Sequence, residues 1–322
     1  MPLSRRTALL AAAGAALARP AAAQDFPNRP LRLVVPYPPG GSTDVIGRIA
    51  AQRLGEVLGQ SVVVDNRGGA SGAVGSQAVA RMPADGYALI VSGVGSHGVV
   101  PAINPAPGYD AVTDFTHVGM LGLFHSVLVV NPAFPATTLQ GFLEEARRRP
   151  GAINYATSGS GSSNHLMGEL IRLEAKVDIV HVPYRGAGPA LQAVLANEVP
   201  AMCDSLPSAA GHIRAGTLRA LAVSSRQRLP ALPDVPTFTE LGLPKIVVEN
   251  WFGISAPAGL PAPVLARLSA ALDTMLRQPD LVARFAEIGF DAQPMAPEPF
   301  AKFVAADVAF WTDAVRRSGV KP

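Results

Sequence analysis

The sequence predicts an α/β protein of two lobes joined by two crossings of the chain, and three observations support this architecture. The chain has 322 residues, which exceeds the size at which a single hydrophobic core usually stops growing. Short β-rich runs alternate with amphipathic helical patterns, as in sheets covered by helices. The alternation is interrupted by proline-rich passages and starts afresh, so the crossings fall near residues 124 and 224. Two such crossings form a hinge, and closure around a ligand is a common use of a hinge.

The first 23 residues predict a removed export signal. Arg5 and Arg6 precede an apolar run at 9–18, and an alanine triplet at 21–23 provides an A-x-A cleavage site. Ten apolar residues are too few to span a bilayer. The segment SRRT fits both a twin-arginine signal and an ordinary basic leader, so both export routes stay open.

The charge balance and the apolar runs of the mature chain argue against nucleic acid and membrane insertion, respectively. Loss of the signal would remove three arginines and no acid, leaving 24 basic and 24 acidic residues. The basic footprint of a nucleic-acid-binding protein is therefore not expected. No later run approaches the roughly 20 apolar residues of a membrane helix, so we expect no direct membrane insertion. Cys203 is the single cysteine, which rules out an intrachain disulfide and favours a buried, unreactive side chain.

The expected elements of the first lobe alternate in order. Strand-like runs occur at 31–35, 61–65 and 87–92, and helical patterns at 44–58 and 72–81. In the first helix the apolar residues recur at 3.6-residue spacing, so one face is available to cover a sheet. We expect parallel strands because each strand is followed by a helix.

The second lobe repeats this alternation, and the chain then ends in helices. The expected strands are 118–123, 126–130, 153–157, 178–184, 199–204 and 218–224, and the expected helices are 139–148, 163–174, 189–197 and 205–214. The tail carries helices at 263–277, 279–288 and 297–317, with one short strand-like run at 252–255. Three helices would make a poor third domain, so we expect them to pack on the first lobe. Lobe 1 is then 24–124 with 225–322, and lobe 2 is 125–224.

Glycine- and serine-rich turns follow the strands of both lobes. They lie at 36–44 (PYPPGGSTD), 66–75 and 92–97 in lobe 1, and at 156–165 (ATSGSGSSNH), 184–190 and 204–208 in lobe 2. Ligands of open α/β sheets bind where strands end and helices begin. Glycine lets backbone N–H groups approach an anion, and a helix N-terminus favours negative charge. Any one of these loops could be an ordinary turn, but loops of this kind in both lobes favour an anion site, for carboxylate or for phosphate.

Motifs for catalysis, metal binding and cofactors are not found. The run 93–98 matches G-x-G-x-x-G, but prolines at 101, 105 and 107 prevent the long helix that a dinucleotide site needs. The chain contains no G-x-S-x-G, H-E-x-x-H or P-loop, so we predict no catalytic residue, metal or cofactor. A secreted hydrolase with a cleft serine and His97 or His165 stays as an alternative.

Three charged residues of these loops have more than one interpretation. Asp44 lies where an acid caps a helix and suits its dipole, and it is also a candidate catalytic acid. Asp204 follows a buried strand and could orient water or accept a hydrogen bond from a ligand amine or hydroxyl. Arg185 could pair with a carboxylate or face solvent.

The chain resembles the Bug (TctC-like) solute-binding receptors of tripartite tricarboxylate transporters. The matching stretches run in order from about residue 30 to 262 and include LRLVVPYPPGGSTDVIGRIAAQRL, VDNRGGASGAVGSQAVA, INYATSGSGSSNHLMGEL, HVPYRGAGPALQAVL and WFGISAPAGLP. The resemblance implies a type II periplasmic-binding (Venus flytrap) fold. It also implies a periplasmic receptor, not an enzyme, that captures a small organic carboxylate for membrane transporter subunits. A receptor for a sensor kinase is the alternative within this class.

The resemblance also implies which residues hold the carboxylate. In lobe 1 they are Tyr37, Gly40, Gly41, Ser42, Thr43, Asp44, Gly69 and Ala70. In lobe 2 they are Ser158, Gly159, Ser160, Gly161, Ser162 and Ser163. Outside these loops it points to His97, Tyr184 and Asp204.

Overall fold

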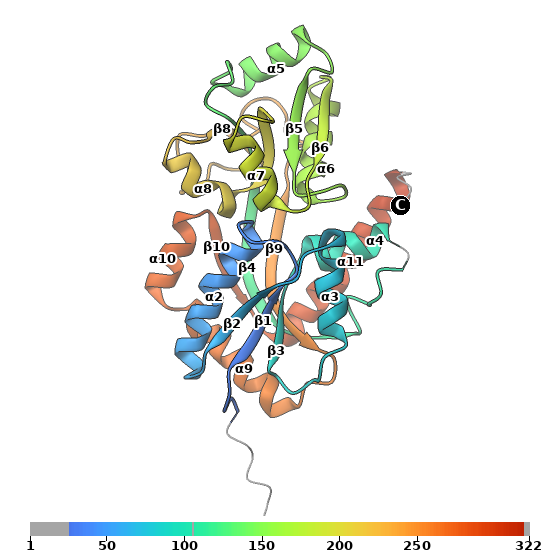
Figure 1. The fold of residues 1–322 in the computed structure, drawn as a ribbon, viewed down its shortest axis with the longest axis vertical. Helices are drawn as coiled ribbons and strands as arrows, with labels where there is room; N and C mark the ends of the chain where they lie inside the picture. The colour runs from blue at the N-terminus through green and yellow to red at the C-terminus, as the bar shows by residue number, and fades with distance from the viewer. Residues whose placement is uncertain (1–25, 105, 319–322) are drawn as a thin grey trace, which may run out of the picture.

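Two α/β lobes are stacked along the long axis of the molecule, and the strand β4 runs through both of them (Figure 1). This is a computed structural model, and it describes residues 26–104 and 106–318. The expected export signal lies outside the described residues. Among the described residues, no helix has both the length and the apolar character needed to cross a membrane.

Lobe 1 is built on a mixed sheet with the strand order β2-β1-β3-β9-β4, and β10 pairs with β4. The strands are β1 Leu31–Val35, β2 Val62–Asn66, β3 Ala88–Gly93, β4 Phe115–Val130, β9 Glu249–Pro257 and β10 Phe290–Met295. The helices are α2 Ser42–Leu58, α3 Ala73–Ala80, α4 Val100–Ile103, α9 Ala262–Leu276, α10 Pro279–Glu287 and α11 Pro297–Ser318. The strands β1, β2 and β3 are parallel, as expected. The strands β9 and β10, which come from the tail, pair antiparallel with their neighbours.

Lobe 2 is built on the second half of β4 and four further strands. These are β5 Ile153–Thr157, β6 Ile179–Pro183, β7 Ala201–Ser205 and β8 Arg219–Val223. Its helices are α5 Leu139–Arg148, α6 Ser163–Glu174, α7 Ala187–Leu195 and α8 Leu206–Arg214. Alternate residues of β4 enter different hydrophobic clusters, with Val127 and Val129 in one and Leu128 and Val130 in the other. Helices therefore cover both faces of this sheet. Cys203 is buried in the core, as predicted.

The first crossing between the lobes lies inside one continuous strand. The sequence predicted separate strands at 118–123 and 126–130, but β4 spans both runs. Phe124 and His125 still pair with β9, and Ser126 already pairs with β7. No turn-forming residue separates the two runs, so the ladder passes from one sheet to the other without a break.

The second crossing lies later than residue 224, which corrects the boundary expected between the lobes. After β8 the chain stays with lobe 2, because Phe238 and Ile246 are buried in its hydrophobic core. It returns to lobe 1 only at β9, where the backbone N–H of Val248 donates to the carbonyl of Ser224. Proline-rich segment 225–248 contains no helix or strand. Hydrophobic periodicity in its sequence therefore could not indicate that it packs on lobe 2.

The C-terminal helices pack on lobe 1, as the sequence predicted. Leu272, Met275 and Phe285 share a hydrophobic cluster with Leu33 of β1. The strand β10 was not predicted, because only Phe290 of its six residues is buried and one residue is proline. Such a strand shows little alternation of apolar and polar residues. Proline is tolerated in β10 because this strand lies at a sheet edge.

The surroundings of two helical glycines predict opposite effects of substitution by alanine. A methyl group on Gly168 would lie 2.1 Å from the buried ring of Tyr155, whereas one on Gly211 in α8 would meet nothing within 4 Å. We expect Gly168→Ala to lower the free energy of unfolding by about 1–3 kcal/mol through overpacking. We expect Gly211→Ala to raise it by up to about 1 kcal/mol through helix propensity. Urea denaturation of both variants measures this difference, and equal effects would contradict the packing described.

Candidate functional site

A cavity of about 70 Å³ lies between the two lobes. At roughly 10–15 Å³ per water molecule, it has room for about five waters or one small organic molecule. Its lining comes from both lobes and from the hinge. It comprises Tyr37, Gly41, Ser42, Thr43, Ser71, Val91, Gly93, Val94, Gly95, Ser96, Phe124, Ser158, Gly161, Ser162, Ser163, Asn164, Ala187, Ser205, Asn250 and Phe252.

The loop before α2 brings a helix N-terminus to the cavity. Gly41 is the N-cap residue in an extended conformation, and Ser42 and Thr43 form the buried first turn. The side chain of Gly41 is a hydrogen atom, so the first N–H groups of α2 can approach a ligand closely. Gly40 is exposed and does not line the cavity.

Asp44 holds this loop in place and does not line the cavity. Its Oδ2 accepts from the backbone N–H of Gly40 at 3.0 Å, and its Oδ1 accepts from Asn66 Nδ2 at 2.9 Å. Arg48 forms an ion pair with the same carboxylate at 2.9 Å. Burial acts to raise the pKa of Asp44, but the hydrogen bonds from Arg48, Gly40 and Asn66 outweigh it and hold that pKa below its ordinary value. This carboxylate therefore stays ionised as a structural group.

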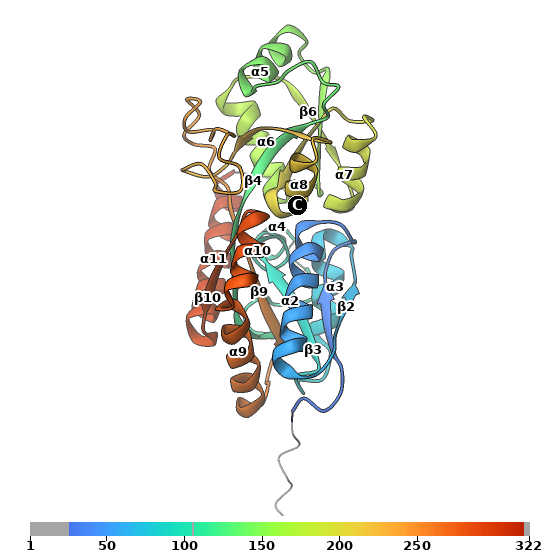
Figure 2. The same cartoon turned by 90° about the vertical axis from the view of Figure 1, so that its left-hand side faces the viewer.

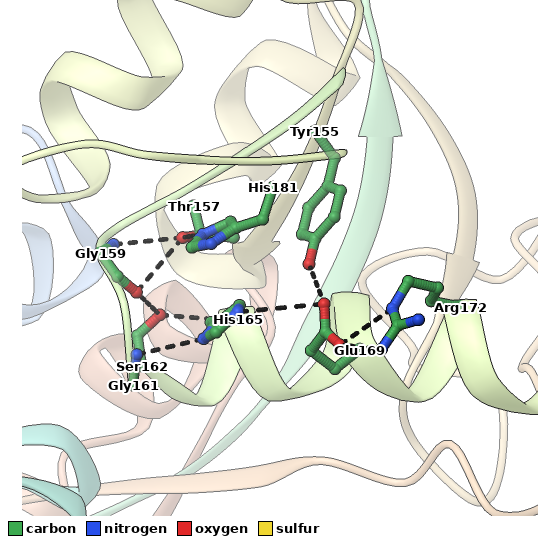
Figure 3. Close-up of polar contacts among 9 residues, drawn as sticks. All are labelled: Tyr155, Thr157, Gly159, Gly161, Ser162, His165, Glu169, Arg172 and His181. Atoms are coloured by element: carbon green, nitrogen blue, oxygen red, sulfur yellow. Dashed lines mark hydrogen bonds and ion pairs between the residues drawn. The ribbon is translucent and has the colours of Figure 1, made fainter. Parts of the chain in front are cut away.

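The loop before α6 brings a second helix N-terminus to the cavity. Ser162 caps α6, because its Oγ accepts from the backbone N–H of His165 at 3.1 Å. The same Oγ donates to the carbonyl of Gly159 at 2.8 Å, which closes the loop on itself (Figure 3). Ser158, Gly161, Ser162 and Ser163 line the cavity, whereas Gly159 is buried behind it and Ser160 is exposed.

Two stacked histidines support this loop from behind. The ring centroids of His165 and His181 lie 3.9 Å apart, and His181 Nε2 lies 2.7 Å from Thr157 Oγ1 (Figure 3). The Nδ1 of His165 accepts from the backbone N–H of Gly161 at 3.2 Å. That contact requires an unprotonated Nδ1, and burial lowers the pKa of His165 in the same sense. His165 therefore positions Gly161 and is not part of the cavity lining.

A strained loop brings Ser71 to the cavity. Ala70 and Ser71 both adopt left-handed backbone conformations, with φ of 46° and 54°. Such strain persists only where the surroundings hold it, and here the Tyr37 hydroxyl donates to the Ser71 carbonyl at 2.9 Å. Gly69 and Ala70, which were expected at the site, are exposed, and Ser71 lines the cavity in their place.

The two lobes touch through a pair of serines at the helix N-termini. The helix α8 lies next to the end of α2 between the lobes (Figure 2). Ser42 Oγ of α2 lies 2.8 Å from Ser208 Oγ of α8, and the Ser208 backbone N–H donates to Ser42 Oγ at 3.2 Å. Ser208 Oγ also lies within donating distance, 2.7 Å, of Asp204 Oδ2. Asp204 is fully buried, which raises the pKa of its carboxyl to about 7. It supports the contact between the lobes and does not line the cavity.

Three further candidates lie away from the cavity. His97 is fully buried, its Nδ1 lies 3.0 Å from Ser96 Oγ, and burial together with nearby His117 lowers its pKa to about 3. The backbone N–H of Tyr184 donates to the Thr157 carbonyl, and its side chain packs against the lobe 2 core. Arg185 is exposed and faces solvent.

The hinge supplies cavity residues that the sequence did not indicate. Phe124 comes from β4, and Asn250 and Phe252 come from β9. Only loops at strand ends were considered candidates, so residues inside strands carried no signal. Ser71, Ser96, Asn164, Ala187 and Ser205 lie within the six loops that were singled out, although they were not named individually.

The lining of the cavity carries no formal charge. None of the described residues that line it is Asp, Glu, His, Lys or Arg. Hydroxyl groups and the N-termini of α2 and α6 face it, so it offers hydrogen-bond donors and positive helix ends to an anion. Within the described part of the chain, no group of three or more metal-ligating side chains occurs.

Comparisons with known proteins give a consistent result. A family model described as "Tripartite tricarboxylate transporter family receptor" matches residues 46–320. The protein BugT of Bordetella pertussis is 37% identical over 321 residues, which is 98% of each chain. The periplasmic binding protein BugD has a solved structure with a TM-score of 0.87 at 32% identity, covering 92% of this chain and 99% of that one. MatC of Rhodopseudomonas palustris, solved with bound malate, has a TM-score of 0.82 at 35% identity, covering 90% and 100%.

Buried Asp204 predicts a dependence of stability on pH. The native state keeps its proton up to about pH 7, whereas the unfolded chain loses it near pH 4. Between these values the native state binds more protons, so stability falls as pH rises, by a total on the order of 4 kcal/mol. Asp204→Asn keeps an acceptor for Ser208 and removes this titration.

Urea denaturation at pH 5 and pH 8 measures the effect. We expect the wild-type protein to lose clearly more stability than Asp204→Asn between the two values. Glu287→Gln, which changes an exposed carboxylate, should behave as the wild type does. Identical pH dependence in wild type and Asp204→Asn would show that Asp204 does not titrate in this range.

Proposed function

Because the chain belongs to the tripartite tricarboxylate transporter family of receptors, we propose that it captures a small organic carboxylate and delivers it to the membrane subunits of such a transporter. The family expected from the sequence motifs is thereby confirmed, and so is the two-lobed periplasmic-binding fold. The ligand, the transporter and the individual binding residues are the parts that we propose.

The observation that carries this proposal is the pair of helix N-termini that face one uncharged cavity. Ser42 and Thr43 begin α2, and Ser162 and Ser163 begin α6, and all four line the cavity. Backbone N–H groups and hydroxyls at two helix ends suit a carboxylate without a basic side chain. The structure of MatC contains bound malate, which is a small organic carboxylate.

The hydrolase alternative is wrong. The relatives and structural neighbours are solute-binding receptors, not enzymes. Neither His97 nor His165 lines the cavity, and the Nδ1 of His165 already accepts from the backbone N–H of Gly161.

Closure of the lobes explains how binding and transport would be coupled. A ligand that touches both helix ends binds the closed arrangement better than an open one, so it shifts the population toward closure. The contact between Ser42 and Ser208 would be part of that closed arrangement.

A thermal-shift screen against small carboxylates tests the proposed function directly. A ligand at 100 times its Kd should add about 2.7 kcal/mol of stability. Mass spectrometry of the recovered ligand should find it unchanged. Turnover of a hit, or no stabilisation by any carboxylate, would contradict the receptor function.

Two substitutions in one loop test the position of the carboxylate. Ser163→Asp places a negative charge in the cavity at a helix start, where an acid is compatible with folding. We expect it to weaken carboxylate binding at least a hundredfold by isothermal titration calorimetry. Ser160→Asp adds the same charge at an exposed position of the loop and should change affinity less than about threefold. Equal effects of both substitutions would place the carboxylate elsewhere.

A further inference from the structure

The backbone of the loop before α6 is held by a single imidazole nitrogen. The N–H of Gly161 donates to His165 Nδ1 at 3.2 Å, and the N–H of His165 donates to Ser162 Oγ at 3.1 Å (Figure 3). Gly161 has a left-handed conformation with φ of 74°, and both Gly161 and Ser162 line the cavity. The neutral ring of His165 therefore fixes a part of the loop that faces the cavity.

A proton on His165 turns this hydrogen-bond acceptor into a donor. The neutral imidazole has one acceptor nitrogen, whereas the imidazolium ion has two donors and no acceptor. Two N–H groups would then face each other across the 3.2 Å between Gly161 and His165. His165 also lies in the first turn of α6, where the positive end of the helix dipole disfavours a cation. The observed loop conformation thus requires the neutral ring.

The charged groups around His165 do not offset this conflict. They are Glu169 and Arg172 on α6, Tyr155 on β5, His181 on β6, and Asp178, which acts on Arg172. Glu169 Oε1 lies 4.0 Å from His165 Nε2, which is beyond hydrogen-bond distance. The same carboxylate accepts hydrogen bonds from Tyr155 and Arg172, so it is already neutralised by the guanidinium.

The stacked ring of His181 adds a second obstacle to a charge on His165. The two rings are nearly parallel, with 16° between their planes, and their centroids are 3.9 Å apart. Two positive charges at this distance repel each other strongly. Burial and the nearby His165 lower the pKa of His181 to about 4, and burial lowers the pKa of His165. Both rings are neutral at pH 7, and His165 gains its proton below its ordinary pKa of 6.5.

We propose that His165 sets the pH range in which the receptor holds its ligand. Its neutral ring keeps Gly161 and Ser162 in the cavity lining, and its protonation in an acidic medium releases this loop and weakens carboxylate binding. His165 acts through Gly161, so it is a positioning residue and not a ligand contact. This inference rests on the proposed carboxylate function and adds to it the control of the same site by pH.

Malate binding at pH 7.5 and pH 4.5, measured by isothermal titration calorimetry, tests the effect. His165→Asn places an amide oxygen near the position of Nδ1 and cannot be protonated in this range. We expect the Kd of the wild type to rise at least about threefold more than that of His165→Asn on acidification. His212→Asn makes the same change in the last turn of α8 and should behave as the wild type does. The ionisation of malate and of Asp204 is common to all three proteins and cancels.

A measurement without ligand follows the hydrogen bond itself. The amide resonance of Gly161 in two-dimensional ¹H–¹⁵N NMR spectra reports the contact with His165 Nδ1. We expect its chemical shift to follow one titration below pH 6.5 in the wild type and to stay constant in His165→Asn. Far-UV circular dichroism establishes that each protein is folded at both pH values.

The sign of the effect separates this inference from a simple charge effect. If protonated His165 merely attracted the anion, the wild type would gain affinity on acidification relative to His165→Asn, and that result would overturn the inference. Equal pH dependence of the two proteins would overturn it as well. Absence of malate binding would count against the proposed function, and the Gly161 resonance then decides the inference alone. If His165→Asn does not fold, a Gly161 resonance that stays constant while wild-type His165 gains its proton still contradicts it.

Discussion

The continuous strand β4 is the constraint on which the arrangement of the two lobes depends. It pairs with β9 and β10 in lobe 1 and with β7 and β8 in lobe 2, so one strand fixes both sheets relative to each other. The strand ends that lead into α2, α6 and α8 therefore meet at one place. The strand β9 runs beside β4 at the hinge and contributes Asn250 and Phe252 to the cavity between the lobes.

The charged groups around the cavity serve its structure, while neutral groups face its interior. Asp44 holds the loop before α2, and Glu169 accepts hydrogen bonds from Tyr155 and Arg172 behind the loop before α6. Asp204 supports the serine contact between the lobes. The N-termini of α2 and α6 therefore present fixed dipoles to the cavity, with no cationic side chain in its lining.

The structure places Asp204 away from the cavity that its position in the sequence suggested. The sequence suggested that Asp204 could accept a hydrogen bond from a ligand amine or hydroxyl. Tertiary packing buries Asp204 beside Ser208 and away from the cavity lining, whereas Asn250 is part of that lining. Asn250 lies inside a strand that joins the sheet from the far end of the chain, so no local pattern could associate it with the loops of lobe 2.

The sequence by itself determined the alternation of strands and helices, the family and the two glycine- and serine-rich loops that begin α2 and α6. These features are local, because periodicity, capping residues and turn residues act over a few positions. Only the tertiary structure decided that β4 is one strand, that segment 225–248 covers lobe 2, and that Ser71 and Asn250 line the cavity. Those outcomes depend on contacts between residues far apart in the chain. Side-chain burial and hydrogen-bond partners at the hinge exist only once both crossings are in place.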